Sequence, residues 1–351
     1  MTIDTDKLNA FLGKAVGDVG AGFAAAHTLL GDRLGLYKAM ADGKPVTPAQ
    51  LAKRTGTIER YVREWLNGQA AGGYVTYDPK SEAFTLPPEQ AFCLADETSP
   101  AFLPGVFQVL FAAWQAEPRI EKCFKTGEGI DWGEHHPCLF EGTERFFRAS
   151  YIGNLVSAWI PALDGVEAKL KRGAKVADVG CGHGASTVLM AQAYPKSKFF
   201  GFDVHAPSIE ACRERAKKAG VTGNTTFEVA KAQNFPGTGY DLIAHFDCVH
   251  DMADPVGAAK RAKQALAKDG TWMIVEPVAS DKPEENHNPV GRICYGVSTL
   301  ICVPVSLAGN GPALGAQAGD AKIRDVTTKG GFTRFRRATQ TPFNMVLEVR
   351  P

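Results

Sequence analysis

The sequence predicts an α/β protein in which a doubly wound parallel sheet follows a mainly helical N-terminal region. From residue 171 onward, short apolar runs bounded by Gly or Asp alternate with helical stretches, which is the pattern of parallel βαβ units. Before residue 171 the patterning is helical, apart from one pair of short strands. The 351 residues are 44% hydrophobic and 22% charged, so we expect an ordinary globular chain of about two domains.

Composition excludes several classes of protein. The formal net charge is +1, which does not impose a surface for polyanions. No run approaches the roughly 18 consecutive apolar residues of a membrane helix, so no membrane contact is expected. The eight cysteines include no CxxC pair, which favours reduced thiols and a cytoplasmic location. The run from His135 to Cys138 lacks a second ligand pair, so no metal site is predicted.

Residues 1–90 have the order of elements of a winged helix. Thr47 is placed as an N-cap, with Pro48 at the first helical position and Gln50 completing a capping box. Thr57 opens the next helix, which stops at Gly72. The expected elements are Gly22–Ala41, a short helix from Pro48 to Gly56, Ile58–Ala71, and two strands, Tyr74–Tyr77 and Ala83–Leu86.

Residues 91–170 are predicted to form a helical connector rich in aromatic residues. Aromatic residues at helical spacing are usually core, but here they can also line a pocket or a subunit interface. Tyr151 is our candidate for substrate contact from this segment.

Residues 171–351 carry the alternating pattern. The expected strands are Lys175–Val179, Lys198–Phe202, Thr225–Val229, Leu242–Phe246, Trp272–Val275, Thr333–Thr339 and Asn344–Val349, and the last two form a hairpin at the sheet edge. The expected helices are Ser186–Tyr194, Pro207–Ala219, Val256–Ala267 and Ile323–Thr328. A long insertion, residues 277–321, separates the fifth strand from the last helix.

A glycine-rich turn follows the first of these strands. Asp178 lies at the strand end, Gly180, Gly182 and Gly184 follow with GxGxG spacing, and a helix starts near Ala185. The glycines let a ligand approach the backbone, and a helix N-terminus offers free N–H groups. Dinucleotide folds carry GxGxxG instead, and an acidic residue here would repel a pyrophosphate. The acid suits a cation, such as the amino group and sulfonium of S-adenosylmethionine.

A second acid strengthens this interpretation. Asp203 ends the next strand and follows Asp178 by 25 residues, where a carboxylate can accept hydrogen bonds from both hydroxyls of a ribose. The alternative is an N-cap for the following helix.

Residues 171–351 resemble the Rossmann-like, seven-stranded catalytic domain of class I S-adenosylmethionine-dependent methyltransferases. The motif Asp178–Gly184 resembles their first motif, and Asp203 their ribose acid. The segment 230–236 resembles their adenine loop, but many members have an acid where this chain has Lys231. The cofactor contacts implied are Asp178, Gly180, Cys181, Gly182, Gly184, Asp203, Val204, Ala232, Gln233, Phe246 and Asp247, with S-adenosylhomocysteine as the product.

A winged helix before such a domain is the order found in small-molecule O-methyltransferases and in bacterial relatives labelled regulator-like methyltransferases. In the former, a His-Asp pair follows the fourth strand and its His is the general base; here the pair is His250-Asp251. An imidazole titrates near neutrality and can take a proton from a hydroxyl. The alternative is a packing or cofactor-pocket histidine. Glu276 ends the fifth strand and either orients His250, contacts substrate or is structural.

The insertion 277–321 follows the carboxyl end of a strand, where long segments usually cover sites. We expect a substrate lid with Arg292 and Tyr295 as candidate contacts and a flexible part over Gly309–Gly319; the alternative is a packing helix pair.

Several functions remain to be weighed. The first is methyl transfer to a small-molecule acceptor; the second is a transcriptional regulator that binds S-adenosylmethionine and uses the winged helix on DNA. Residues 1–90 contain ten Lys and Arg and ten Asp and Glu, so DNA binding is disfavoured. The resemblance instead implies subunit contact through this domain, and therefore a homodimer. A nicotinamide or flavin enzyme is disfavoured by the glycine spacing.

Overall fold

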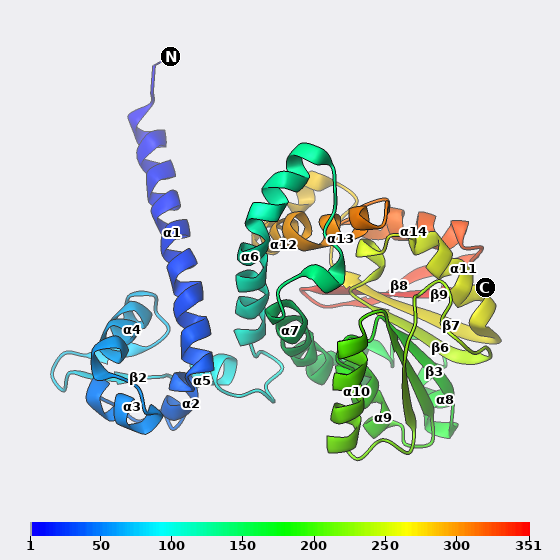
Figure 1. Ribbon diagram of the computed structural model, residues 1–351, viewed down its shortest axis with the longest axis horizontal. Coiled ribbons are helices and arrows are strands. Elements are labelled where there is room, and N and C mark those ends of the chain that lie inside the picture. Colours follow the sequence, from blue (N-terminus) through cyan, green and yellow to red (C-terminus); the bar gives the residue numbers. More distant parts are fainter. Residues whose placement is uncertain (1) are drawn as a thin grey trace. The chain divides into compact units, whose positions relative to one another are not determined.

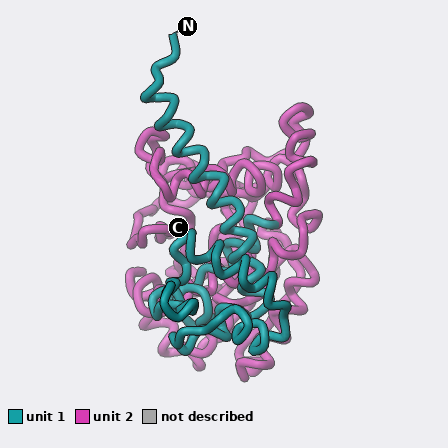
Figure 2. The backbone as a smooth tube through the Cα atoms, turned by 90° about the vertical axis from the view of Figure 1, so that its left-hand side faces the viewer, with its two compact units in different colours: residues 1–111 teal, residues 112–351 magenta. Residues whose placement is uncertain are grey.

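The computed structural model describes residues 2–351, which form two compact units (Figures 1 and 2). The first unit ends at Phe111, and the second runs from Ala112 to Pro351. The boundary lies within α6, so the segment predicted as a connector contributes residues to both units.

The first unit contains the winged helix. Its elements are α1 (Thr5–Arg33), α2 (Leu36–Met40), α3 (Pro48–Thr55), α4 (Glu59–Ala71), β1 (Thr76–Asp78), β2 (Ala83–Thr85) and α5 (Pro88–Leu94). The predicted capping box is confirmed. The Thr47 hydroxyl accepts a hydrogen bond from the Gln50 backbone N–H, and the Gln50 side-chain oxygen accepts one from the Thr47 backbone N–H. The N-cap of α4 is Ile58 rather than Thr57, whose hydroxyl instead pairs with Thr55. The two strands are antiparallel, as expected.

The prediction of one helix over Gly22–Ala41 was wrong at its start and in its continuity, because two helices, α1 and α2, cover this range. Helix α1 begins 17 residues earlier, where the side chain of Asp4 accepts hydrogen bonds from the N–H groups of Asp6 and Lys7. It ends at Arg33 because Gly35 takes a left-handed conformation, with φ of 68°.

The connector is helical, as predicted. Its elements are α6 (Pro104–Thr126), the 3₁₀ turn η1 (Trp132–Glu134), α7 (Cys138–Asn154), the π-helical turn η2 (Leu155–Trp159) and α8 (Val166–Arg172).

The second unit is built on a seven-stranded sheet, which confirms the predicted fold class. The strand order is β5-β4-β3-β6-β7-β9-β8, with β3 to β7 parallel and the terminal hairpin antiparallel. The strands are β3 (Lys175–Val179), β4 (Lys198–Asp203), β5 (Thr225–Val229), β6 (Tyr240–Phe246), β7 (Leu266–Pro277), β8 (Arg334–Gln340) and β9 (Asn344–Arg350). Strand β7 is longer than the predicted Trp272–Val275 because its first part pairs with Tyr240 across a bulge.

Helices cover both faces of this sheet (Figure 1). One apolar core joins the sheet to η2, α8, α9 (Ala185–Ala193) and α10 (Ala206–Lys218). The other joins it to α11 (Pro255–Ala265) and α14 (Gly319–Lys329). The remaining elements are η3 (Val249–Asp251), η4 (Pro283–Asn286), α12 (Pro289–Val297), the π-helical turn η5 (Ser298–Cys302) and α13 (Val303–Ala308).

Within residues 2–351, one helical run has the length and hydropathy of a membrane span. It is Pro289–Ala308, and 33% of its apolar window is buried inside the protein. Arg292 and several polar residues interrupt this run, so it does not contain 18 consecutive apolar residues.

Candidate functional site

Four acidic residues lie where parallel strands end at one edge of the sheet. Asp203 is the last residue of β4, Asp247 directly follows β6, and Glu276 is the penultimate residue of β7; Asp178 is the penultimate residue of β3. In an open α/β sheet, ligands bind at the carboxyl ends of the strands, at the point where the strand order reverses. Strands β3 and β6 are neighbours here, although β4 and β5 separate them in the sequence.

The glycine turn needs glycine at all three positions. Gly180, Gly182 and Gly184 have φ of 77°, 52° and 76°, a left-handed region that other residues adopt only with strain. A Cβ on Gly180 would lie 2.9 Å from the Cys248 thiol, and one on Gly184 would lie 2.9 Å from the Cys212 thiol. The turn therefore has no room for a side chain at Gly180 or Gly184, whereas a Cβ on Gly182 would meet no atom within 4 Å.

Asp178 is fully buried below this turn. Its Oδ2 accepts hydrogen bonds of 2.6 Å from the hydroxyls of both Ser186 and Thr187, in the first turn of α9. Among the described residues its Oδ1 has no hydrogen-bond partner. Burial raises the pKa of Asp178 to about 6, although the two hydroxyls oppose that shift. A buried carboxylate oxygen without a partner is a ready acceptor for a cationic ligand group.

Asp203 holds the glycine turn against the end of β4. Its Oδ2 accepts from Gly182 N–H at 2.9 Å, and its Oδ1 accepts from His205 N–H at 2.9 Å. Burial raises the pKa of Asp203, and these backbone donors oppose it. Each oxygen keeps capacity for a further donor.

The other predicted cofactor residues have differing surroundings. Cys181 is buried and lies 3.9 Å from Cys212, sulfur to sulfur, so it packs under the turn. Val204 is exposed, and the Gln233 side chain donates to the Asp254 carbonyl. Phe246 is buried, and its ring centroid lies 5.1 Å from that of Tyr151. The rings of Tyr151 and Phe246 therefore meet, although the two residues come from different elements.

His250 and Glu276 are in direct contact. The imidazole Nδ1 of His250 hydrogen-bonds Glu276 Oε2, and Glu276 Oε1 accepts from Val249 N–H at 2.9 Å. Both side chains are buried. Burial lowers the pKa of His250, but the charge and hydrogen bonding of Glu276, together with Cys302, outweigh it and raise that pKa well above its usual value. This contact fixes the ring and leaves Nε2 as its other nitrogen.

Two residues around this pair, Asn344 and Cys302, were not expected from the sequence. Asn344, at the start of β9, donates to Asp247 Oδ1 at 3.0 Å, and among residues 2–351 Asp247 Oδ2 has no partner. Asp247 has a left-handed φ of 50°, a strain that is common at functional sites. Cys302 lies beside His250, and burial raises the pKa of Asp251 to about 7. Only the tertiary fold brings these residues together.

The insertion contacts the His250 loop. Ser306 Oγ donates to the Met252 carbonyl at 2.9 Å, and Gly315 N–H donates to the His250 carbonyl at 3.2 Å. The segment expected to be flexible is thus hydrogen-bonded to the site at Gly315. Arg292 and Tyr295 occupy exposed positions of α12, and the Tyr295 ring lies 6.5 Å from that of His287.

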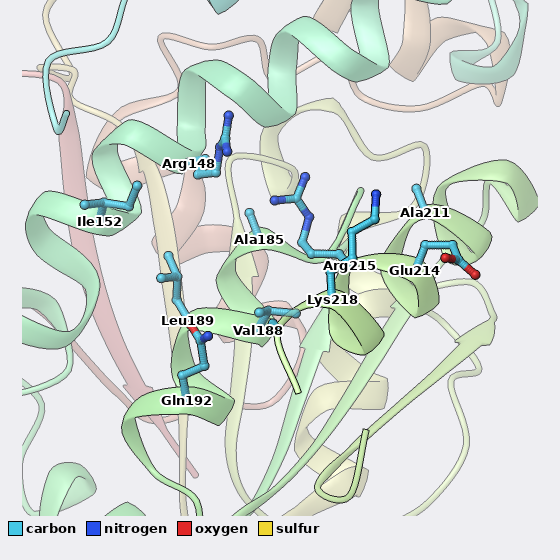
Figure 3. A pocket seen from close by; sticks show the side chains of 11 residues that line it. Arg148, Ile152, Ala185, Val188, Leu189, Gln192, Ala211, Glu214, Arg215 and Lys218 are labelled. Atoms are coloured by element: carbon cyan, nitrogen blue, oxygen red, sulfur yellow. The ribbon is translucent and has the colours of Figure 1, made fainter. Parts of the chain in front are cut away.

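A separate cleft of about 610 Å³ lies between α7, α9 and α10 (Figure 3). None of the predicted site residues lines it. Two of its cations, Arg148 and Arg215, pair with Glu144 at 3.2 and 2.8 Å. Arg215 also donates a hydrogen bond of 3.0 Å to the His183 carbonyl in the glycine turn, so this side chain supports the turn from the side of the cleft. Within residues 2–351, no group of three or more His, Cys, Asp or Glu side chains is arranged to hold a metal ion.

Comparisons with known proteins agree with this geometry. Residues 170–314 match a methyltransferase domain, and residues 22–96 match an Rv2258c-like winged helix-turn-helix domain. The trans-aconitate 2-methyltransferase of Afipia carboxidovorans is 30% identical over 109 residues, which cover 31% of this chain and 41% of that protein. The chain spans between 41% and 51% of the length of the first curated relatives it matches.

Solved structures share the fold along nearly the whole chain. The mitomycin 7-O-methyltransferase is 19% identical, with a TM-score of 0.72 over 99% of this chain and 100% of that one. Human N-acetylserotonin methyltransferase, solved with S-adenosylmethionine, is 13% identical, with a TM-score of 0.73 over 97% of each chain. At these identities the likeness establishes the fold.

Proposed function

We propose that this chain, a class I methyltransferase domain behind an N-terminal winged helix, transfers a methyl group from S-adenosylmethionine to a small-molecule hydroxyl. The observation that carries the proposal is the buried His250–Glu276 pair, which lies at the same sheet edge as the glycine turn. When bound, the cofactor supplies a methyl group already activated on a sulfonium, and S-adenosylhomocysteine is the product.

The described residues fit this cofactor. The unpartnered Oδ1 of Asp178 suits its ammonium group, and the left-handed glycines leave the backbone of the turn accessible. Asp203 has acceptor capacity for ribose hydroxyls. Cys181, Val204, Ala232, Gln233, Phe246 and Asp247 complete the proposed cofactor contacts, with Tyr151, Arg292 and Tyr295 as the proposed acceptor contacts.

His250 is the proposed general base. The Glu276 carboxylate accepts from Nδ1–H, so the lone pair of Nε2 can take the acceptor hydroxyl proton as its oxygen gains the methyl group. Glu276 stabilises the resulting imidazolium, the same effect that raises the pKa of His250. The neutral imidazole is the active form, so turnover rises with pH above neutrality.

The regulator alternative has less support. Arg60 and Arg63 of α4 form ion pairs of 2.6 and 2.5 Å with Glu64 and Glu59 of the same helix. This helix therefore offers little net charge to phosphates. We also propose a cytoplasmic location and a homodimer. The proposed domains are residues 1–90, 91–170 and 171–351, with a lid at 277–321.

The proposal is tested by turnover. Purified protein is incubated with S-adenosylmethionine and a panel of phenolic and aliphatic hydroxyl compounds, and release of S-adenosylhomocysteine is measured. Once an acceptor is found, His250→Ala should lower turnover at least about a hundredfold, the usual scale for a general base, with unchanged cofactor affinity. A His250→Ala variant that turns over normally would exclude His250 as the base.

A further inference from the structure

The cleft between α7, α9 and α10 has the size of a small-molecule site. Its volume is about 610 Å³, and ligand pockets in proteins enclose roughly 300–1,000 Å³. None of the residues proposed to bind cofactor or acceptor lines it, so its lining is separate from the site at the carboxyl ends of the strands. Apolar side chains make up most of this lining, namely Ile152 of α7, Ala185, Val188 and Leu189 of α9, Ala211 of α10 and Ala219 at its C-terminal end.

The cleft is also lined by cations. Arg215 and Lys218 are three residues apart, so they lie on the same face of α10. In Figure 3 both side chains extend from α10 in the same direction, and the Glu214 carboxylate points away from them. Arg148 lines the cleft from α7, and the remaining polar residue is Gln192. Three cations and one acid therefore line the cleft, which favours an anionic ligand.

Arg215 is held in place before any ligand binds. Its Nη2 forms an ion pair of 2.8 Å with Glu144, whose side chain is only 6% exposed, and its Nε donates to the His183 carbonyl at 3.0 Å. Its Nη1 keeps donor capacity for a ligand. A guanidinium that is already fixed in position loses little conformational entropy when it binds an anion.

Support of the glycine turn does not account for the whole lining. That role needs Arg215 and Glu144, but it does not need the exposed Lys218, nor Ile152, which is 38% exposed. An apolar wall beside an ammonium and a guanidinium fits a ligand that has both an apolar body and an anionic group. Because Glu144 already balances one positive charge here, a singly charged carboxylate fits better than a doubly charged phosphate.

We propose that the cleft binds an organic monoanion, with its carboxylate between Arg215 and Lys218 and its apolar body along Val188 and Leu189. Arg215 then contacts the carboxylate through Nη1 and the His183 carbonyl through Nε. Binding in the cleft orders the side chain that holds the glycine turn, so it raises the affinity of the turn for the cofactor. This coupling rests on the proposed function, whereas binding in the cleft does not.

Calorimetric titration of the full chain tests the class of ligand. Octanoate has both an apolar chain and a charge, octanamide keeps the chain without the charge, and acetate keeps the charge without the chain. We expect octanoate to bind at least about tenfold more tightly than either, because charged hydrogen bonds and apolar burial both contribute. Absence of octanoate binding would overturn the proposal, and so would octanamide that binds as tightly as octanoate.

Two neighbouring lysines give a matched pair of variants that tests the place of binding. Lys217 and Lys218 are both exposed and both lie in the last turn of α10, but only Lys218 lines the cleft. Lys218→Glu should weaken octanoate binding at least about tenfold, and Lys217→Glu less than about twofold. Equal effects of the two variants, or no effect of either, would place octanoate elsewhere on the protein and overturn the site.

The coupling is measured by titrating S-adenosylhomocysteine with and without saturating octanoate. We expect at least about fivefold tighter binding with octanoate present. Arg215→Lys keeps the positive charge but not the two-sided contact of a guanidinium, so octanoate should still bind and should no longer change this affinity. Unchanged affinity in the wild-type chain would overturn the coupling. If S-adenosylhomocysteine does not bind at all, the proposed function fails, and the octanoate titrations still decide whether the cleft is a binding site.

Discussion

We predict that Asp178 makes cofactor affinity depend on pH. Burial raises the pKa of Asp178 to about 6 in the protein without ligand. An ammonium group bound at its unpartnered Oδ1 favours the ionised carboxylate. Protonation of Asp178 therefore competes with the cofactor, and affinity should fall as pH falls through about 6.

The size of the effect follows from the pKa. At pH 5, one unit below it, about one tenth of the Asp178 side chains are ionised, so binding should be about tenfold weaker than at pH 8. This corresponds to about 1.4 kcal/mol of binding free energy. Asp178→Asn should bind weakly at both pH values, because an amide cannot become anionic.

Calorimetric titration with S-adenosylmethionine from pH 5 to pH 8 measures this directly. Ser186→Ala is a useful control, because losing its hydrogen bond to Asp178 should raise the pKa and move the midpoint to higher pH. Affinity that does not change with pH in the wild-type protein would show that protonation of Asp178 does not compete with the cofactor. So would an Asp178→Asn variant that retains the full pH dependence, since another group would then be titrating.

Three further predictions concern the same edge of the sheet. Glu276→Gln removes the charge that raises the pKa of His250, so the rise of turnover with pH should move to lower pH while cofactor affinity stays constant; an unmoved pH–rate profile would contradict the proposed role. Asp203→Ala should weaken cofactor binding at least about tenfold by calorimetry, and unchanged affinity in a folded variant would remove the ribose assignment. Gly180→Ala should lower the free energy of unfolding, measured in urea, by about 1–3 kcal/mol, because φ at this position is 77° and the added Cβ meets Cys248. Adding Cys248→Ala should restore only part of the lost stability. Wild-type stability for Gly180→Ala would contradict the backbone strain.

The parts of the fold that depend on local patterning were predictable. The strands and helices after residue 171 alternate in the sequence, and most of their predicted bounds agree closely with the structure. The exception is β7, which begins at Leu266, inside the predicted helix Val256–Ala267. The glycine turn was also predictable, because positive φ favours glycine and the spaced glycines are visible in the sequence. Helix α1 was missed over its first half because Gly13, Gly17 and Gly20 lower its helix propensity, although Asp4 caps its start.

The arrangement of the site was predictable only in part. His250 and Glu276 could be named because each lies near the carboxyl end of a strand of the same sheet, but their contact depends on strand order. Asn344 and Cys302 gave no sequence signal, since they reach Asp247 and His250 from segments about 100 and 50 residues away. Such contacts arise from the tertiary fold alone.

We expect the glycine turn and its two acids, Asp178 and Asp203, to bind S-adenosylmethionine. Calorimetric titration of the purified chain with S-adenosylmethionine, S-adenosylhomocysteine and NAD in parallel tests it most directly. We expect micromolar binding of the two sulfur nucleosides and no heat of binding with NAD. Absence of binding by both sulfur nucleosides, or tighter binding of NAD, would contradict it.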